Sequence, residues 1–243
     1  SIVLKKPFYM GIKEVTNKEF RAFFLDHDSG SFGGQSLNRD DQPVVRVTWE
    51  QAALYCNWLS ARESLPPVYV KRGDRLVAAE PAGPGYRLPT EAEWEYCARF
   101  SANGPIQKYP WGDTFPPKPG TANVADVSSK DLINDYVEGY NDGYPVSATP
   151  GSFKPNALGV HDLAGNASEW CHDYYSIYPE KTATAEEDPT GPGEGQHRVV
   201  RGSSYKHGSI SALRSAYRDY SSAPREDLGF RVCRYADEVA AKE

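Results

Sequence analysis

The sequence has no long hydrophobic run and no excess of positive charge. No stretch of its 243 residues approaches the roughly 20 apolar residues that span a bilayer, and the start, SIVLKKPFYM, lacks the apolar core of a signal peptide. The 33 Asp and Glu outnumber the 27 Lys and Arg and are spread along the chain, for a net charge of −6. We therefore expect no membrane span, and no nucleic-acid partner, because nucleic-acid binding needs a concentrated basic surface.

Cysteine is also scarce. The four cysteines, Cys56, Cys97, Cys171 and Cys233, lie 41, 74 and 62 positions apart, and this spacing excludes CxxC zinc or redox motifs. An even count in a chain rich in Tyr and Trp is compatible with export and disulfides. The alternative is four buried free thiols.

The composition that remains is typical of a soluble, loop-rich globular protein. A hydrophobic content of 39% suffices for a core, whereas 21 Gly and 19 Pro predict frequent turns and little regular structure. There is no repeat and no low-complexity linker, so we expect one domain over residues 1–243. Segments 71–85 and 179–196 are the expected exposed excursions, and the RGD at 72–74 is interpreted as a chance tripeptide in a turn.

Three segments predict helices, each with a Thr that can cap the helix and a Glu or Gln three residues later. They are EVTNKEFRAFFLDH (14–27), VTWEQAALYCNWLSAR (47–62) and LPTEAEWEYCARF (88–100). Beyond about residue 100 only brief strand-like runs occur, such as HRVVRG and LGFRVCR. The fold class we expect is α+β with much irregular backbone.

Seven strings occur in an order that is informative as a set: EVTNKEF (14–20), QPVVRVTWEQAALYCNW (42–58), GYRLPTEAEWEYCAR (85–99), YPWGD (109–113), NALGVHDLAGNASEW (156–170), VVRGSSY (199–205) and LGFRVCR (228–234). Together they resemble the formylglycine-generating enzyme, or sulfatase-modifying-factor, family over almost the whole chain. The resemblance implies that family's single-domain fold, a divergent C-type-lectin-like α+β body.

The resemblance also implies where catalysis would occur. Active members convert a cysteine of a client sulfatase to formylglycine with copper(I) and oxygen, using two cysteines in a stretch that begins with the RG.SY string. Aligned without gaps, that stretch places His207 and Ala212 at the two cysteine positions, and Ser168 stands where active members carry a tryptophan. Ser204 matches a family active-site serine, but a serine alone does not bind copper(I). We expect no formylglycine generation and no copper.

His207 raises the alternative of a different metal site. A site needs two or three convergent donors, and the other histidines have no HxH or HxxxH spacing. A lone histidine is therefore favoured over a ligand.

Calcium is the ion that the resemblance supports, as two structural ions. The family's first site implies Asn123, the Val124 carbonyl, Asp142 and the Tyr144 carbonyl; its second implies Asp162, the Gly165 and Ala167 carbonyls, and Glu169. These hard oxygen ligands suit calcium. The alternative is that Asp142 and Glu169 are capping or turn residues.

The family's cysteine pairing carries over only in part. It implies a disulfide between Cys56 and Cys233, although Cys233 stands one residue later than the family position.

The remaining side chains of 201–218 indicate recognition, because Tyr and Arg offer contact area and directional donors. The partner-binding candidates are Ser204, Tyr205, His207, Arg214, Tyr217 and Arg218. The alternative is that the arginines pair with acidic loops and the tyrosines are core.

Two functions stay open. The first is a non-catalytic binding or regulatory protein, periplasmic or secreted, with a protein or peptide partner such as a kinase ectodomain. Its pattern is similar to that of periplasmic (TagR-like) regulators that promote a transmembrane Ser/Thr kinase in type VI secretion. The second is an oxidoreductase with non-thiol cofactor chemistry, as in family members that tailor siderophores.

Overall fold

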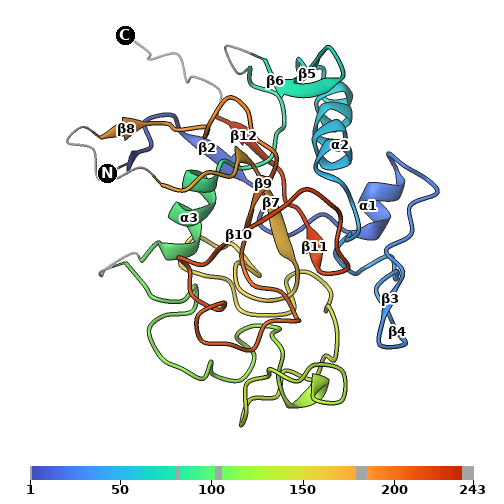
Figure 1. Cartoon of the computed structure of the whole chain (residues 1–243), viewed down its shortest axis with the longest axis vertical. Coiled ribbons are helices and arrows are strands. Elements are labelled where there is room, and N and C mark those ends of the chain that lie inside the picture. Colours follow the sequence, from blue (N-terminus) through green and yellow to red (C-terminus); the bar gives the residue numbers. More distant parts are fainter. Residues whose placement is uncertain (1, 80–82, 102–105, 179–184, 237–243) are drawn as a thin grey trace.

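A computed structural model describes residues 2–79, 83–101, 106–178 and 185–236 of the chain. The fold is a small α+β domain with few helices and short, separate sheets (Figure 1). In chain order its elements are β1 (Ile2–Val3), β2 (Phe8–Met10), α1 (Asn17–Arg21), β3 (Ser31–Phe32), β4 (Gln35–Ser36), α2 (Trp49–Arg62), β5 (Tyr69–Arg72), β6 (Arg75–Ala78), α3 (Glu91–Arg99), the 3-10 turn η1 (Val127–Ser129), β7 (Ser168–Tyr174), β8 (Glu186–Glu187), β9 (Arg198–Arg201), β10 (Arg218–Ser221), β11 (Leu228–Gly229) and β12 (Cys233–Tyr235). No helix in the described ranges is long and apolar enough to cross a membrane.

The three predicted helices are confirmed, and each begins after the threonine that the sequence indicates. Thr16, Thr48 and Thr90 all accept a hydrogen bond from the backbone three residues on, and the Glu or Gln at that position bonds back to the cap. The first helix is shorter than expected and ends at Arg21. Beyond it the backbone tightens into a turn, with Phe23 donating to the carbonyl of Phe20 at 2.9 Å.

The central sheet has the order β10-β9-β7-β11, in which β11 runs parallel to β7 and the other neighbours are antiparallel. The main core lies between this sheet and α2. Two tryptophans link the sheet to the start of α2 by hydrogen bonds. Trp49 Nε1 donates to the Cys171 carbonyl at 2.8 Å, and Trp170 Nε1 donates to the Val47 carbonyl at 3.0 Å. The strand-like runs of the sequence thus supply β9, β11 and β12.

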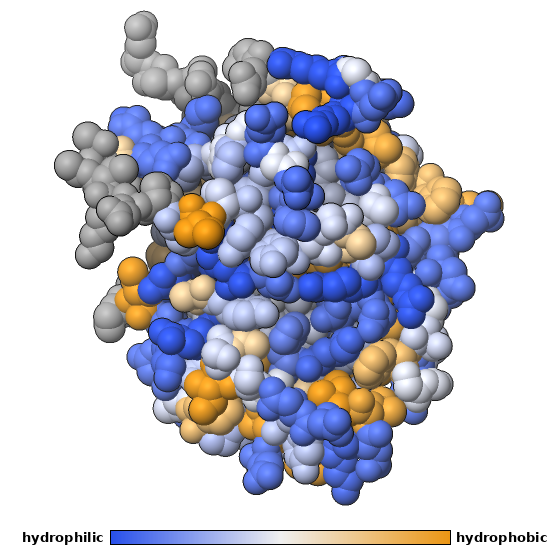
Figure 2. Space-filling view, viewed as in Figure 1, coloured by the Kyte–Doolittle hydropathy of each residue, from blue (hydrophilic) through white to orange (hydrophobic). Residues whose placement is uncertain are grey.

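Residues 106–166 form the lower part of the molecule in Figure 1, and between α3 and β7 the described backbone there has only η1 as a regular helix. Buried polar side chains replace the missing hydrogen-bond ladders. Asn156 Oδ1 accepts hydrogen bonds from the Leu158 and Val160 amides at 3.0 and 3.1 Å, and Asn156 Nδ2 donates to the Cys97 carbonyl at 2.7 Å. Figure 2 shows a mostly hydrophilic face on which hydrophobic residues gather in separate patches, several of them on this lower part.

The four cysteines are buried and unbridged, so the Cys56–Cys233 disulfide implied by the family is not formed. Cys56 lies on α2 and is buried in the main core. The Cys233 thiol instead faces Glu93, with its Sγ 3.7 Å from Oε2. The alternative of buried free thiols describes this structure.

The exposed excursion at 71–85 contains the β5–β6 hairpin, with the RGD tripeptide at its tip. Residues 80–82 of that excursion and 179–184 of the second lie outside the described residues.

Candidate functional site

The segment after β9 places Ser204 and His207 against Asp227 in a compact polar cluster. Ser204 Oγ lies 2.8 Å from Asp227 Oδ2 and 2.9 Å from His207 Nδ1. The backbone N–H of Ser204 also donates to His207 Nδ1 at 2.9 Å. An imidazole nitrogen that accepts an amide proton carries none itself, so the neutral ring holds its proton on Nε2.

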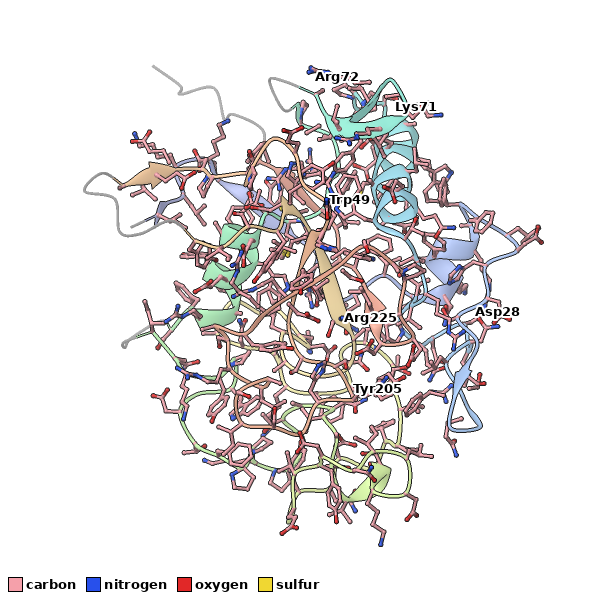
Figure 3. All side chains as sticks on the ribbon, viewed as in Figure 1. Asp28, Trp49, Lys71, Arg72, Tyr205 and Arg225 are labelled. Carbon is pink, nitrogen blue, oxygen red and sulfur yellow. The ribbon has the colours of Figure 1, made fainter. Side chains whose placement is uncertain are left out.

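The surroundings keep His207 neutral. Burial lowers its pKa first, and the cations Arg225 and Lys206 lower it further, against the opposing carboxylates of Asp227 and Asp219. Lys206 is itself tied to Glu226 at 2.8 Å. In Figure 3 the labelled Arg225 lies near the centre of the view, with Tyr205 below it.

This arrangement has no reactive thiol. Ala212, at the second family cysteine position, is buried and apolar. The chain's four cysteines lie elsewhere, and burial is the main cause that raises the pKa of each thiol. Ser204 is fully buried, and its hydroxyl is held between Asp227 and His207 rather than presented to a substrate. Ser168, which replaces the family tryptophan, is buried and donates to the Gly202 carbonyl at 3.1 Å.

The partner-binding candidates do not form one surface. Tyr205 is only 1% exposed and packs in a core cluster with Leu37 and Val45, so the expectation that it contacts a partner is wrong, as it is for the fully buried Ser204. Arg218 pairs with both carboxylate oxygens of Glu91, which is the first residue of α3 rather than part of an acidic loop.

Two further candidates remain accessible, and one of them lies beside His207. Tyr217 is half-buried, with its ring centroid 5.9 Å from that of His207, and Arg214 is exposed. The accessible part of the predicted surface is therefore His207, Arg214 and Tyr217.

The residues of the first predicted calcium site come together. Asp142 accepts hydrogen bonds from the Val124 amide at 2.9 Å and the Tyr144 amide at 2.7 Å. Burial, reinforced by the carboxylate of Asp126, raises the pKa of Asp142 to about 7 against the backbone donors. Asn123 Oδ1 is buried without a hydrogen-bond partner.

Crowded carboxylates and an unpartnered amide oxygen are groups that a hard cation would satisfy, so these residues fit calcium. No cluster of three or more His, Cys, Asp and Glu suited to a metal occurs in the described ranges, so amide and carbonyl oxygens would have to complete the coordination.

The second predicted set does not fit. Glu169 is fully buried, and both its oxygens are engaged by Arg231, at 2.7 and 2.6 Å, while Trp94 Nε1 donates to it at 2.8 Å. A carboxylate neutralised in this way is a poor calcium ligand. Asp162 accepts from the Gly151 amide at 2.6 Å and leaves Oδ1 unpartnered. The Gly165 amide donates to Ser203, and Ala167 is buried against Tyr205.

Sequence reasoning missed Asp227, Asp126 and Glu14. Glu14 is buried next to Asp162, accepts from Asn166 at 2.9 Å, and has a pKa raised well above its usual value by burial and by Asp162. It lies within the quoted string EVTNKEF, but a pattern that indicates a helix cap carries no sign of a contact 148 residues away at Asp162.

The fold defines a class: a small, loop-rich α+β domain with few helices and short sheets. The model of the sulfatase-modifying factor enzyme 1-like domain matches residues 1–236. The chain belongs to this family.

The similar proteins include a formylglycine-generating enzyme, a relative that is named inactive and a protein kinase. A formylglycine-generating enzyme of Streptomyces coelicolor is 35% identical over 207 residues, covering 82% of this chain and 54% of that enzyme. The inactive C-alpha-formylglycine-generating enzyme 2 of Mus musculus is 31% identical, covering 84% and 65%. The serine/threonine-protein kinase pkn1 of Chlamydia pneumoniae is 31% identical, covering 79% of this chain and 24% of the kinase.

Among solved structures, Treponema denticola variable protein 1 has a TM-score of 0.76 at 28% identity and covers 97% of this chain and 86% of that one. This likeness confirms the expected fold class. The chain spans about half the length of the formylglycine-generating enzymes that it matches, 54% of the Streptomyces coelicolor protein.

Proposed function

We propose that this chain is a non-catalytic member of its family that acts as a binding or regulatory module for a protein partner. The observation that carries the proposal is the Ser204–His207–Asp227 cluster, in which a neutral imidazole and a buried hydroxyl occupy the place of a thiol centre. Copper(I) chemistry in this family needs soft thiolates, and the cluster offers none.

Two of the relatives support the proposal. One carries the word inactive in its name, and in another the matching region makes up 24% of a Ser/Thr kinase. We propose that the partner is the ectodomain of a transmembrane Ser/Thr kinase, as in type VI secretion. We also propose that the chain acts in the periplasm or after secretion.

The catalytic part of the proposal is tested with copper(I), oxygen and a cysteine peptide of the sulfatase type. Mass spectrometry should detect no formylglycine with the natural chain. The matched control is the double variant His207→Cys, Ala212→Cys, which places thiols at the two family cysteine positions and should bind copper(I). Conversion by the natural chain at the rate of an active relative would reject the proposal.

The binding part is tested with a purified kinase ectodomain encoded in the same genome. Arg214→Ala and Tyr217→Ala change accessible side chains, of which Tyr217 lies beside His207, and both should weaken binding. Lys130→Ala, an exposed residue of the lower loops, is the control. Equal affinities for all four proteins would remove this surface from the interface.

We propose one structural calcium ion, held through Asn123, Asp142 and the carbonyls of Val124 and Tyr144. When bound, it would supply positive charge that offsets the repulsion between Asp142 and Asp126.

A further inference from the structure

A large groove lies beside α3, away from the His207 cluster. Its volume is about 1620 Å³, and its walls come from the N-terminal strands, α3 and the segments that follow β7 and β8. Sixteen large hydrophobic side chains are exposed in the described part of the chain, and seven of them line this groove, including Tyr9, Ile12, Tyr96 and Tyr178. Such a concentration of exposed apolar side chains is typical of a binding surface.

The groove also has a carboxylate that forms no ion pair with any described residue. Asp173, on β7, lines it and is 5% exposed, and its Oδ2 accepts from the Glu91 amide at 2.8 Å. No Lys or Arg of the described residues forms an ion pair with Asp173. Arg198 acts on Asp173 only at longer range, and a nearly buried carboxylate without an ion-pair partner is unfavourable, so burial raises the pKa of Asp173 to about 7.

The neighbouring acids are different, because arginines of the chain already neutralise them. Glu91 pairs with Arg201 at 3.1 Å and with Arg218, and Glu95 pairs with Arg99 at 2.5 Å and Arg201 at 3.0 Å. Among the described residues, Asp173 is therefore the buried carboxylate of the groove that no ion pair neutralises.

The backbone at Gly191 packs directly against Asp173. Gly191 also lines the groove and has φ of +75°, and a Cβ there would lie 2.8 Å from the Asp173 Cβ and 3.1 Å from its Oδ1. Only a glycine fits so close to this carboxylate.

We propose that this groove binds a segment of the partner protein that carries large apolar side chains around one Lys or Arg, whose cation pairs with Asp173. The inference rests on the proposed function and specifies the partner's chemistry. Aromatic walls contact the apolar side chains and the methylene stem of the basic residue, while the carboxylate selects its charged end.

The test uses fluorescein-labelled peptides that place Lys, Arg, norleucine or Glu between two Phe residues, titrated with the full chain. Lys and Arg peptides should bind at least about tenfold more tightly than the norleucine peptide, and the Glu peptide weakest. In Asp173→Asn the Lys and norleucine peptides should bind nearly equally. Tyr178→Ser should weaken binding of all peptides.

Matched controls separate the groove from the rest of the surface. Asp131→Asn removes an exposed carboxylate of the lower loops, and Tyr220→Ser removes a tyrosine that is 47% exposed on β10, and neither residue lines the groove. Both should keep the selectivity of the natural chain. Circular dichroism of each variant establishes that it is folded.

Three outcomes would overturn the inference: no saturable peptide binding, an unchanged preference for Lys in Asp173→Asn, or a concentration-dependent dimer that Tyr178→Ser abolishes. The last would assign the groove to a second copy of the chain. Binding of the kinase ectodomain without peptide selectivity would reject the groove alone and leave the proposed function standing.

Discussion

The ionisation of single buried residues sets how stability depends on pH, and Asp173 is the clearest case. Its pKa in the folded chain is raised to about 7, mainly by burial, so the folded state holds a proton that the unfolded state releases near pH 4. A raised acid pKa means that stability is greatest at low pH and is lost as the pH rises through about 7.

Asp173→Asn keeps an oxygen to accept from the Glu91 amide but removes the ionisation. We expect equal unfolding free energies for variant and natural chain near pH 4, and a variant more stable by roughly 1–4 kcal/mol at pH 8. Urea unfolding at both pH values measures the difference. A variant that is less stable at pH 8 would contradict the assignment.

Tyr205 and Arg214 were both expected to contact a partner, but they differ in burial and so should differ in their effect on stability. Tyr205→Ala should lower the unfolding free energy by roughly 3–5 kcal/mol, because it empties a core site next to Leu37 and Val45. Arg214→Ala should change it by less than about 0.5 kcal/mol, because the side chain is exposed. Urea midpoints compare them, and similar midpoints would place Tyr205 outside the core.

At the scale of the element, α3 joins a local cap to a buried ion pair. Thr90 Oγ1 accepts a hydrogen bond from the Glu93 amide at 3.2 Å. The Glu93 carboxylate accepts hydrogen bonds from two guanidinium nitrogens of Arg87, each at 2.7 Å. Thr90→Ala should cost about 1 kcal/mol, the usual value of a cap. Glu93→Gln should cost roughly 3–5 kcal/mol, because it leaves Arg87 buried without its charge partner. Equal losses in thermal or urea unfolding would show that the pair is dispensable.

Elements were predictable where the signal is local. The Thr16, Thr48 and Thr90 caps act over three residues, so their spacing in the sequence contains the whole interaction. The resemblance added the family's single-domain fold and the position of His207. It did not reveal Asp227, because the hydrogen bond from Ser204 spans 23 residues of mostly irregular chain. Tyr205 was misplaced for a related reason: in a loop without periodicity, the sequence does not indicate which side chains face inward.

At the scale of the whole molecule, the lower loops hold together through side-chain hydrogen bonds, so an ion among them would affect the stability of the entire fold. The Asn123 and Asp142 site fits calcium, whereas Glu169 is taken by Arg231. We therefore predict one calcium per chain rather than the two implied by the family.

Calcium should raise the melting temperature of chelator-treated protein, because an ion that binds only the folded state stabilises it by mass action. The effect should be larger at pH 8 than at pH 5, since Asp142 has a pKa of about 7 without the ion and protons compete with calcium. Asp142→Asn should abolish the calcium response, and Asp162→Asn should keep it. Two ions per chain by mass spectrometry, or a response lost in Asp162→Asn, would show that the second loop also binds the ion, despite the Arg231 pair.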